Sequence, residues 1–125
     1  MLTSITRPAA ALLLACTLAA CANISHRPAT LVPAQGGAAA RTLAVQAELR
    51  LDTGYQRTLK AGSQWLPVGR IAEGEVLRPQ RDVFTIEGGH IHEAWLVLRD
   101  GALVGFYLPA ERGFSPLAPV ALQFN

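Results

Sequence analysis

Apolar and polar side chains alternate along the segment from Thr42 to Asp52. Every odd position from 43 to 51 is apolar, and every even position from 46 to 52 is polar or charged. A period of two residues is typical of a strand with one buried side and one solvated side. Asp52-Thr53-Gly54 then offers a three-residue loop, because glycine accepts the positive φ that a bulged hairpin requires. The pattern therefore predicts a hairpin whose returning strand is Tyr55 to Leu59.

Two more hairpins are predicted between Val83 and Leu108, because Gly88-Gly89 and Asp100-Gly101 both favour two-residue turns. These turns predict the following opposed pairs: Glu87 with His90, Thr85 with His92, Val97 with Val104, Trp95 with Phe106, and Glu93 with Leu108. One sheet face would then collect these apolar residues: Phe84, Ile86, Ile91, Trp95, Val97, Val104, Phe106 and Leu108. A single bulge would exchange the two faces, because side chains alternate along a strand.

The remaining segments also favour strands over helices. Gln64 to Pro79 is compatible with two short strands around a turn at Glu73-Gly74, and Val120 to Phe124 with a final edge strand after an irregular stretch. Short strands separated by regular turn signals are typical of sandwiches and barrels. We therefore expect residues 42–125 to form an all-β domain, a small antiparallel sandwich or partly open barrel of about six to eight short strands.

The segment that precedes this domain has a different character. Residues 21–41 contain Pro28, Pro33 and Gly36-Gly37, without hydrophobic periodicity and without an aromatic residue. Such a composition is typical of a flexible linker. The sequence predicts a tether over these residues.

The first twenty residues have the layout of a secretory signal peptide, with a basic residue at Arg7, an apolar run and small residues before Cys21. The sequence Leu18-Ala19-Ala20-Cys21 resembles the lipobox of bacterial lipoproteins. This resemblance, which covers about the first 21 residues, implies cleavage after residue 20 and attachment of fatty acyl chains such as palmitate to Cys21. Ala22 stands where an aspartate would imply retention in the inner membrane, so the resemblance implies the periplasmic face of the outer membrane. Lipidation at Cys16, an unlipidated signal peptide and an uncleaved anchor are the alternatives.

The composition argues against several classes of protein. The 125 residues carry a formal net charge of +2, with 16% charged residues, which argues against a nucleic-acid binder that depends on phosphate contacts. The apolar runs are shorter than the roughly 18 residues of a spanning helix. Two cysteines cannot make a disulfide-rich scaffold. We expect no cofactor beyond the covalent lipid.

Potential metal ligands gather at His90-Ile91-His92-Glu93. A His-x-His on one strand directs both imidazoles to the same face, and Glu87 is a plausible third ligand of a zinc-type site. The alternative is a polar strand end with ordinary cross-strand pairs. Glu93 falls on the predicted core face, where a carboxylate would need a partner or would act as a functional acid.

The sequence offers little for enzymatic catalysis, since Ser63 and Ser115 lie outside any Gly-x-Ser-x-Gly setting and no phosphate-binding glycine loop precedes a helix. We therefore expect a protein that is not an enzyme. Aromatic residues and arginine are enriched in interaction surfaces, and the candidates for such a surface are Trp65, Tyr107, Arg112 and Phe114.

Together these features favour a lipid-anchored outer-membrane protein whose non-catalytic β domain binds another, unidentified component of the cell envelope. The alternative is a carrier of a small ligand or metal that uses His90, His92 and Glu87. Metal titration of the paired histidine variants separates the two hypotheses.

Overall fold

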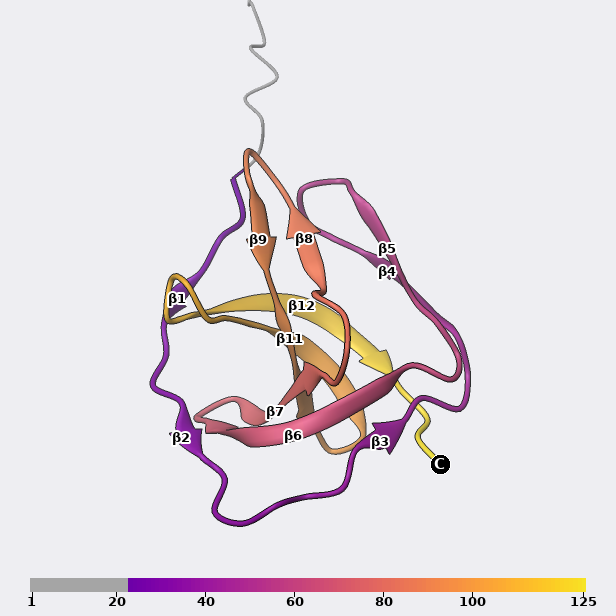
Figure 1. The fold of residues 1–125 in the computed structure, drawn as a ribbon. Helices are drawn as coiled ribbons and strands as arrows, with labels where there is room; N and C mark the ends of the chain where they lie inside the picture. The colour runs from indigo at the N-terminus through magenta and orange to yellow at the C-terminus, as the bar shows by residue number, and fades with distance from the viewer. Residues whose placement is uncertain (1–22) are drawn as a thin grey trace, which may run out of the picture.

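The computed structural model describes residues 23–125, which form an all-β protein with no helix in this range (Figure 1). The strands, in chain order, are β1 (Arg27–Pro28), β2 (Val32–Pro33), β3 (Arg41–Thr42), β4 (Ala47–Arg50), β5 (Gln56–Leu59), β6 (Gln64–Ile71), β7 (Gly74–Pro79), β8 (Thr85–Glu87), β9 (Ile91–Glu93), β10 (Trp95–Arg99), β11 (Ala102–Leu108) and β12 (Gly113–Ala121).

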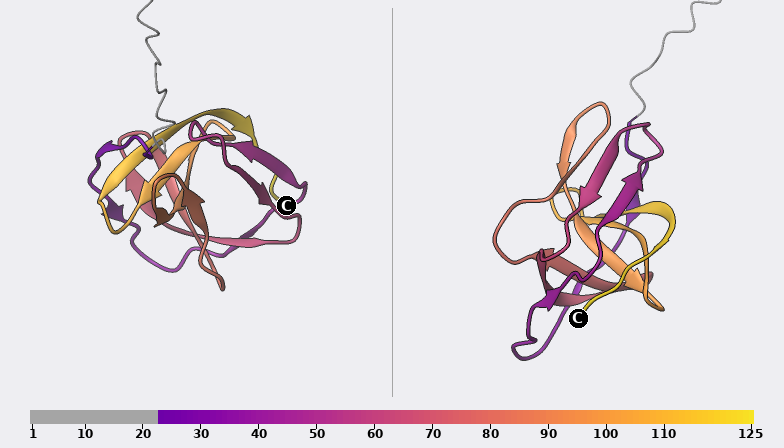
Figure 2. Two further views of the ribbon diagram at one scale, coloured as in Figure 1. Left: turned by 90° about the horizontal axis from the view of Figure 1, so that it is seen from above. Right: turned by 90° about the vertical axis from the view of Figure 1, so that its right-hand side faces the viewer.

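Eight of these strands make one antiparallel sheet. Seven follow the order β1-β12-β11-β10-β7-β6-β2, and β3 pairs with the first residues of β6. The sheet curls strongly into a half-barrel, while β4–β5 and β8–β9 form separate two-stranded ribbons (Figure 2). The expected all-β, partly open barrel is therefore confirmed.

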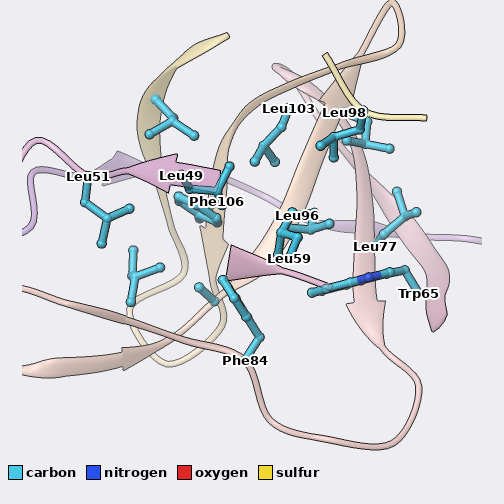
Figure 3. Close-up of a cluster of buried hydrophobic side chains, with 14 of the residues drawn as sticks. Leu49, Leu51, Leu59, Trp65, Leu77, Phe84, Leu96, Leu98, Leu103 and Phe106 are labelled. Carbon is cyan, nitrogen blue, oxygen red and sulfur yellow. The ribbon is translucent and has the colours of Figure 1, made fainter. Parts of the chain in front are cut away.

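The main core fills the inner side of the curled sheet. Leu77, Leu96 and Phe106 project from central strands and meet Leu49 and Leu59 of the β4–β5 ribbon (Figure 3). All five side chains are almost completely buried. The ribbon therefore covers the inner face, as the alternation from Thr42 to Asp52 predicted for its apolar side, although Val45 is exposed.

A second apolar cluster lies on the opposite face of the sheet. Its buried members come from β6, β7, β10, β11 and β12, and they are Ile71, Val76, Val97, Tyr107 and Phe114. Ala29 and Leu31 of the N-terminal segment pack against this cluster. Both faces of the central strands are therefore covered, and the segment before residue 42 provides part of the outer cover.

The prediction that residues 22–41 form a flexible tether is therefore wrong for the described part of that segment. Backbone pairs join Arg27 to Phe114 and Val32 to Arg70, and the amide of Ala34 donates to the carbonyl of Val68 at 2.9 Å. Strands of two residues are too short to show a hydrophobic period. Their stability comes from covering the outer cluster and satisfying edge backbone groups.

The Asp100-Gly101 turn is confirmed, because Arg99 pairs with Ala102 and both turn residues have positive φ, 51° and 77°. The register beyond this turn was predicted wrongly. Val97 pairs with Gly105 while Leu98 pairs with Leu103, so a bulge accommodates Val104. The bulge shifts the alternation by one residue.

The shift corrects the predicted core face. Phe106 and Leu108 do point into the main core, but Trp95, Val97 and Val104 belong to the outer cluster. The opposed pair of Trp95 is Tyr107, not Phe106.

The other hairpins differ in detail. The Gly88-Gly89 turn also takes in His90, whose carbonyl accepts from the amide of Gly88 at 3.0 Å. The observed opposed pairs are Thr85 with Glu93, Ile86 with His92, and Glu87 with Ile91. At the C-terminal end, Pro116 and Pro119 lie inside β12, which ends at Ala121.

Candidate functional site

The proposed metal ligands do not converge. His90 is exposed in the turn, and Glu87 lies opposite Ile91 rather than His90. His92 instead meets Glu111, with 2.7 Å between Nδ1 and Oε1. Within residues 23–125, no three His, Cys, Asp or Glu side chains form a group that could hold a metal ion. The arrangement is a partly buried His–Glu pair that ties β9 to the turn before β12.

Glu93 is not the buried acid that the predicted register implied. Its side chain is exposed at the end of β9, and its Oε1 accepts a hydrogen bond from the indole Nε1 of Trp95 at 3.3 Å. Two changes of register are the physical reason. The three-residue turn places Glu93 opposite Thr85 in the β8–β9 ribbon, and the bulge at Val104 places Tyr107 opposite Trp95, so Leu108 is no longer opposite Glu93.

The predicted interaction surface is also corrected. Trp65, Tyr107 and Phe114 are buried members of the two apolar clusters, and only Arg112 of the four candidates is exposed. Phe114 lies in β12, where the guanidinium of Arg27 covers its ring at 4.9 Å. Tyr107 and Phe114 therefore stabilise the fold and are not available to a partner.

A groove that the sequence analysis missed lies between the end of β5, the start of β6 and the connection from β7 to β8. It encloses a volume of about 690 Å³ and is open to solvent. Trp65 and Phe84 form part of its base, with ring centroids 5.7 Å apart in an edge-to-face arrangement (Figure 3). Two chain segments, residues 57–65 and 79–84, build this groove.

Cationic side chains dominate the charge of the groove. Arg57, Lys60 and Arg81 line it together with a single carboxylate, Asp82. The guanidinium of Arg57 stacks over the ring of Phe84 at 4.9 Å, which holds it in place. Its Nε is buried and finds no hydrogen-bond partner in the part of the chain that the structure describes. The groove therefore combines a guanidinium held by stacking with two further cations.

The indole of Trp65 is positioned by a short chain of hydrogen bonds. Its Nε1 donates to Ser63 Oγ at 3.0 Å, and Ser63 Oγ donates to the carbonyl of Lys60 at 2.6 Å. These bonds fix the turn that joins β5 to β6 and thereby the wall of the groove. No local sequence pattern joins Arg57, Lys60 and Arg81, so the sequence alone does not reveal the groove.

Cys21, the predicted lipidation site, and the alternative Cys16 lie outside the described residues. Residues 23–125 contain no helix that could span a membrane. Comparison of the chain with protein-family models, with curated proteins and with solved structures finds no match.

Proposed function

We propose that the chain is a lipoprotein of the bacterial cell envelope, anchored at the periplasmic face of the outer membrane through Cys21, with a non-catalytic β domain that binds another envelope component. The observation that carries this proposal is the sequence Leu18-Ala19-Ala20-Cys21 at the end of an apolar run. Lipid chains on one cysteine provide stable membrane attachment without a spanning helix.

The groove is the surface that best suits such binding. Guanidinium groups form directed hydrogen bonds to carboxylates and phosphates, and Arg57 lines the groove with its guanidinium stacked over Phe84. Lys60 and Arg81 add positive charge at the rim. We therefore propose a partner that presents anionic oxygens, held in a groove whose aromatic base contacts the apolar part of the ligand.

Lipid attachment is tested by growing cells with an alkyne-labelled palmitate and measuring the mass of the N-terminal peptide of the mature protein. We expect label in the wild type and in Cys16→Ser, but none in Cys21→Ser, which should leave the membrane fraction. Label that persists in Cys21→Ser, or an unmodified N-terminal peptide in the wild type, contradicts the proposed anchor.

Partner binding is tested with a photo-crosslinking amino acid placed at Lys60, inside the groove, or at Arg99, an exposed control outside it. In intact cells we expect a discrete adduct from position 60 only. The added substitution Arg81→Glu should abolish it, whereas Arg99→Glu, with the same charge change, should not. Equal adducts from both positions, or an adduct insensitive to Arg81→Glu, would count against the groove.

A further inference from the structure

The distance between the predicted lipid and the folded domain is very short. Ile24 is 9% exposed and belongs to the main core, only three residues after Cys21. Three residues span at most about 11 Å when fully extended. If Cys21 carries the lipid, the surface around Ile24 must therefore lie close to the membrane, whatever conformation the connecting residues adopt.

The surroundings of Ile24 identify that surface. Ile24 and Ser25 line a small cavity together with Leu51, Thr53 and Ile86. These contacts bring the N-terminal segment beside the β4–β5 turn and the β8–β9 ribbon. Figures 1 and 2 show the start of the described chain and both ribbon turns at the same end of the molecule. The hydroxyl of Thr53 donates to the carbonyl of Glu87 at 2.7 Å, so the two ribbons are joined at this end.

The outer side chains at this end suit a lipid interface. Tyr55 is 49% exposed beside the β4–β5 turn, and Ile91 is 70% exposed beside the β8–β9 turn. Tyrosine is enriched at the headgroup level, where its ring and hydroxyl meet apolar and polar surroundings, and an exposed isoleucine gains by leaving water. The neighbouring charges, Arg50, Asp52 and Glu87, are of mixed sign. Contact at this end therefore depends on the short connection and apolar side chains more than on attraction to anionic lipid.

We propose that the end of the domain formed by residues 52–55 and 88–91 rests on the lipid headgroups, with Tyr55 and Ile91 at the interface, and that the short connection to Cys21 sets this orientation. The inference rests on the proposed lipidation of Cys21. The loop between β2 and β3 lies at the opposite end of the molecule (Figure 1), so it points away from the membrane in this arrangement.

The test uses the full mature lipoprotein, purified from membranes and reconstituted into phosphatidylethanolamine–phosphatidylglycerol vesicles. A single thiol is introduced by Ile91→Cys or, as the control in the distal β2–β3 loop, by Ala38→Cys, and is labelled with an environment-sensitive fluorophore. Lipids carrying a headgroup spin label should quench the probe at residue 91 at least about threefold more than at residue 38, since an interfacial group sits within the outer several ångströms of the bilayer.

A second variant tests the role of the connection. A flexible insertion of about 20 glycine and serine residues between Ala22 and Asn23 lets the domain move some 25 Å from the anchor, and quenching at residue 91 should then fall towards that at residue 38. Unchanged quenching would overturn the inference that the connection sets the orientation. Equal quenching at both positions without the insertion, or a shielded residue 91 that lipid does not quench, would also overturn it.

These outcomes are separate from the fate of the proposed function. Acyl chains on Cys21 with equal quenching at residues 91 and 38 refute the orientation and leave the anchor intact. An N-terminal peptide without acyl chains refutes both.

Discussion

Replacing Ile24 by alanine separates a packed N-terminal segment from a flexible tether. The substitution removes three methyl or methylene groups from a residue that is only 9% exposed and belongs to the main core. Transfer of these groups from water accounts for about 2.4 kcal/mol at roughly 0.8 kcal/mol each. Ile24 lines a small existing cavity, so little additional contact remains to be lost. We therefore expect a loss of about 2–3 kcal/mol in the free energy of unfolding, at the lower end for an Ile→Ala change in a core.

The assay is urea denaturation of a chain that begins at residue 22, followed by circular dichroism and tryptophan fluorescence. The matched control is Val32→Ala, a substitution in the same segment at a side chain that is 63% exposed. It should change the free energy of unfolding by less than about 0.5 kcal/mol. At a denaturant slope of about 1–3 kcal/mol/M, a loss of about 2–3 kcal/mol should lower the urea midpoint of Ile24→Ala by about 0.7–3 M.

The two variants should differ clearly in their free energy of unfolding. If Ile24→Ala stays within about 0.5 kcal/mol of the wild type, the side chain does not contribute to the core. The segment would then behave as a tether, and the short distance between lipid and domain would no longer follow.

Two further predictions concern the sheet and the His–Glu pair. Gly105→Ala should destabilise the domain by about 2–3 kcal/mol, because a Cβ there would lie 2.3 Å from the carbonyl oxygen of Ser115. The control Gly37→Ala, at a position with open space around it, should be nearly neutral. Equal midpoints of thermal denaturation for the two variants would contradict the close approach of Gly105 to Ser115. His92→Ala should lower the free energy of unfolding by about 1–2 kcal/mol, because Glu111 loses the donor that lies 2.7 Å away. His92→Gln should lower it by less. A double-mutant cycle with Glu111→Gln that shows no coupling energy would refute a stabilising His92–Glu111 pair.

Short sequence patterns correctly predicted the turn and the strand whose conformation depends mainly on neighbouring residues. Asp100-Gly101 was identifiable because both residues readily accept positive φ, which a two-residue hairpin turn needs. The strand β4 was identifiable from its alternation, since one side of it packs on the core. These elements depend on residues that are adjacent in sequence.

The register errors arose from contacts that are distant in sequence. The bulge at Val104 lies where β11 approaches β12 so closely that Gly105 meets the carbonyl of Ser115. No pattern within β10 and β11 reveals this approach, and one extra residue is enough to exchange inner and outer faces. The extended β8–β9 turn had the same effect on His92 and Glu93.

The predicted interaction surface was wrong, and the groove was not predicted, for a related reason. An aromatic residue near glycine and proline, such as Phe114, has the sequence context of an exposed loop, yet the outer face of the sheet needs its apolar surface as cover. The cationic groove has the opposite property, because Arg57, Lys60 and Arg81 are ordinary surface residues until the fold brings their segments together. Neither assignment follows from spacing alone.

The N-terminal segment is part of the folded domain, and this affects how a lipid anchor would hold the protein. Its prolines and glycines resemble those of a linker, but Ala29 and Leu31 complete the outer cover of the sheet and Ile24 enters the main core. The segment cannot move away from the domain without exposing Val76, Val97 and Tyr107, an apolar surface that is costly in water. A lipid on Cys21 would therefore be joined to Ile24 of the folded core through only two intervening residues, and the position of Ile24 would determine which end of the domain faces the membrane.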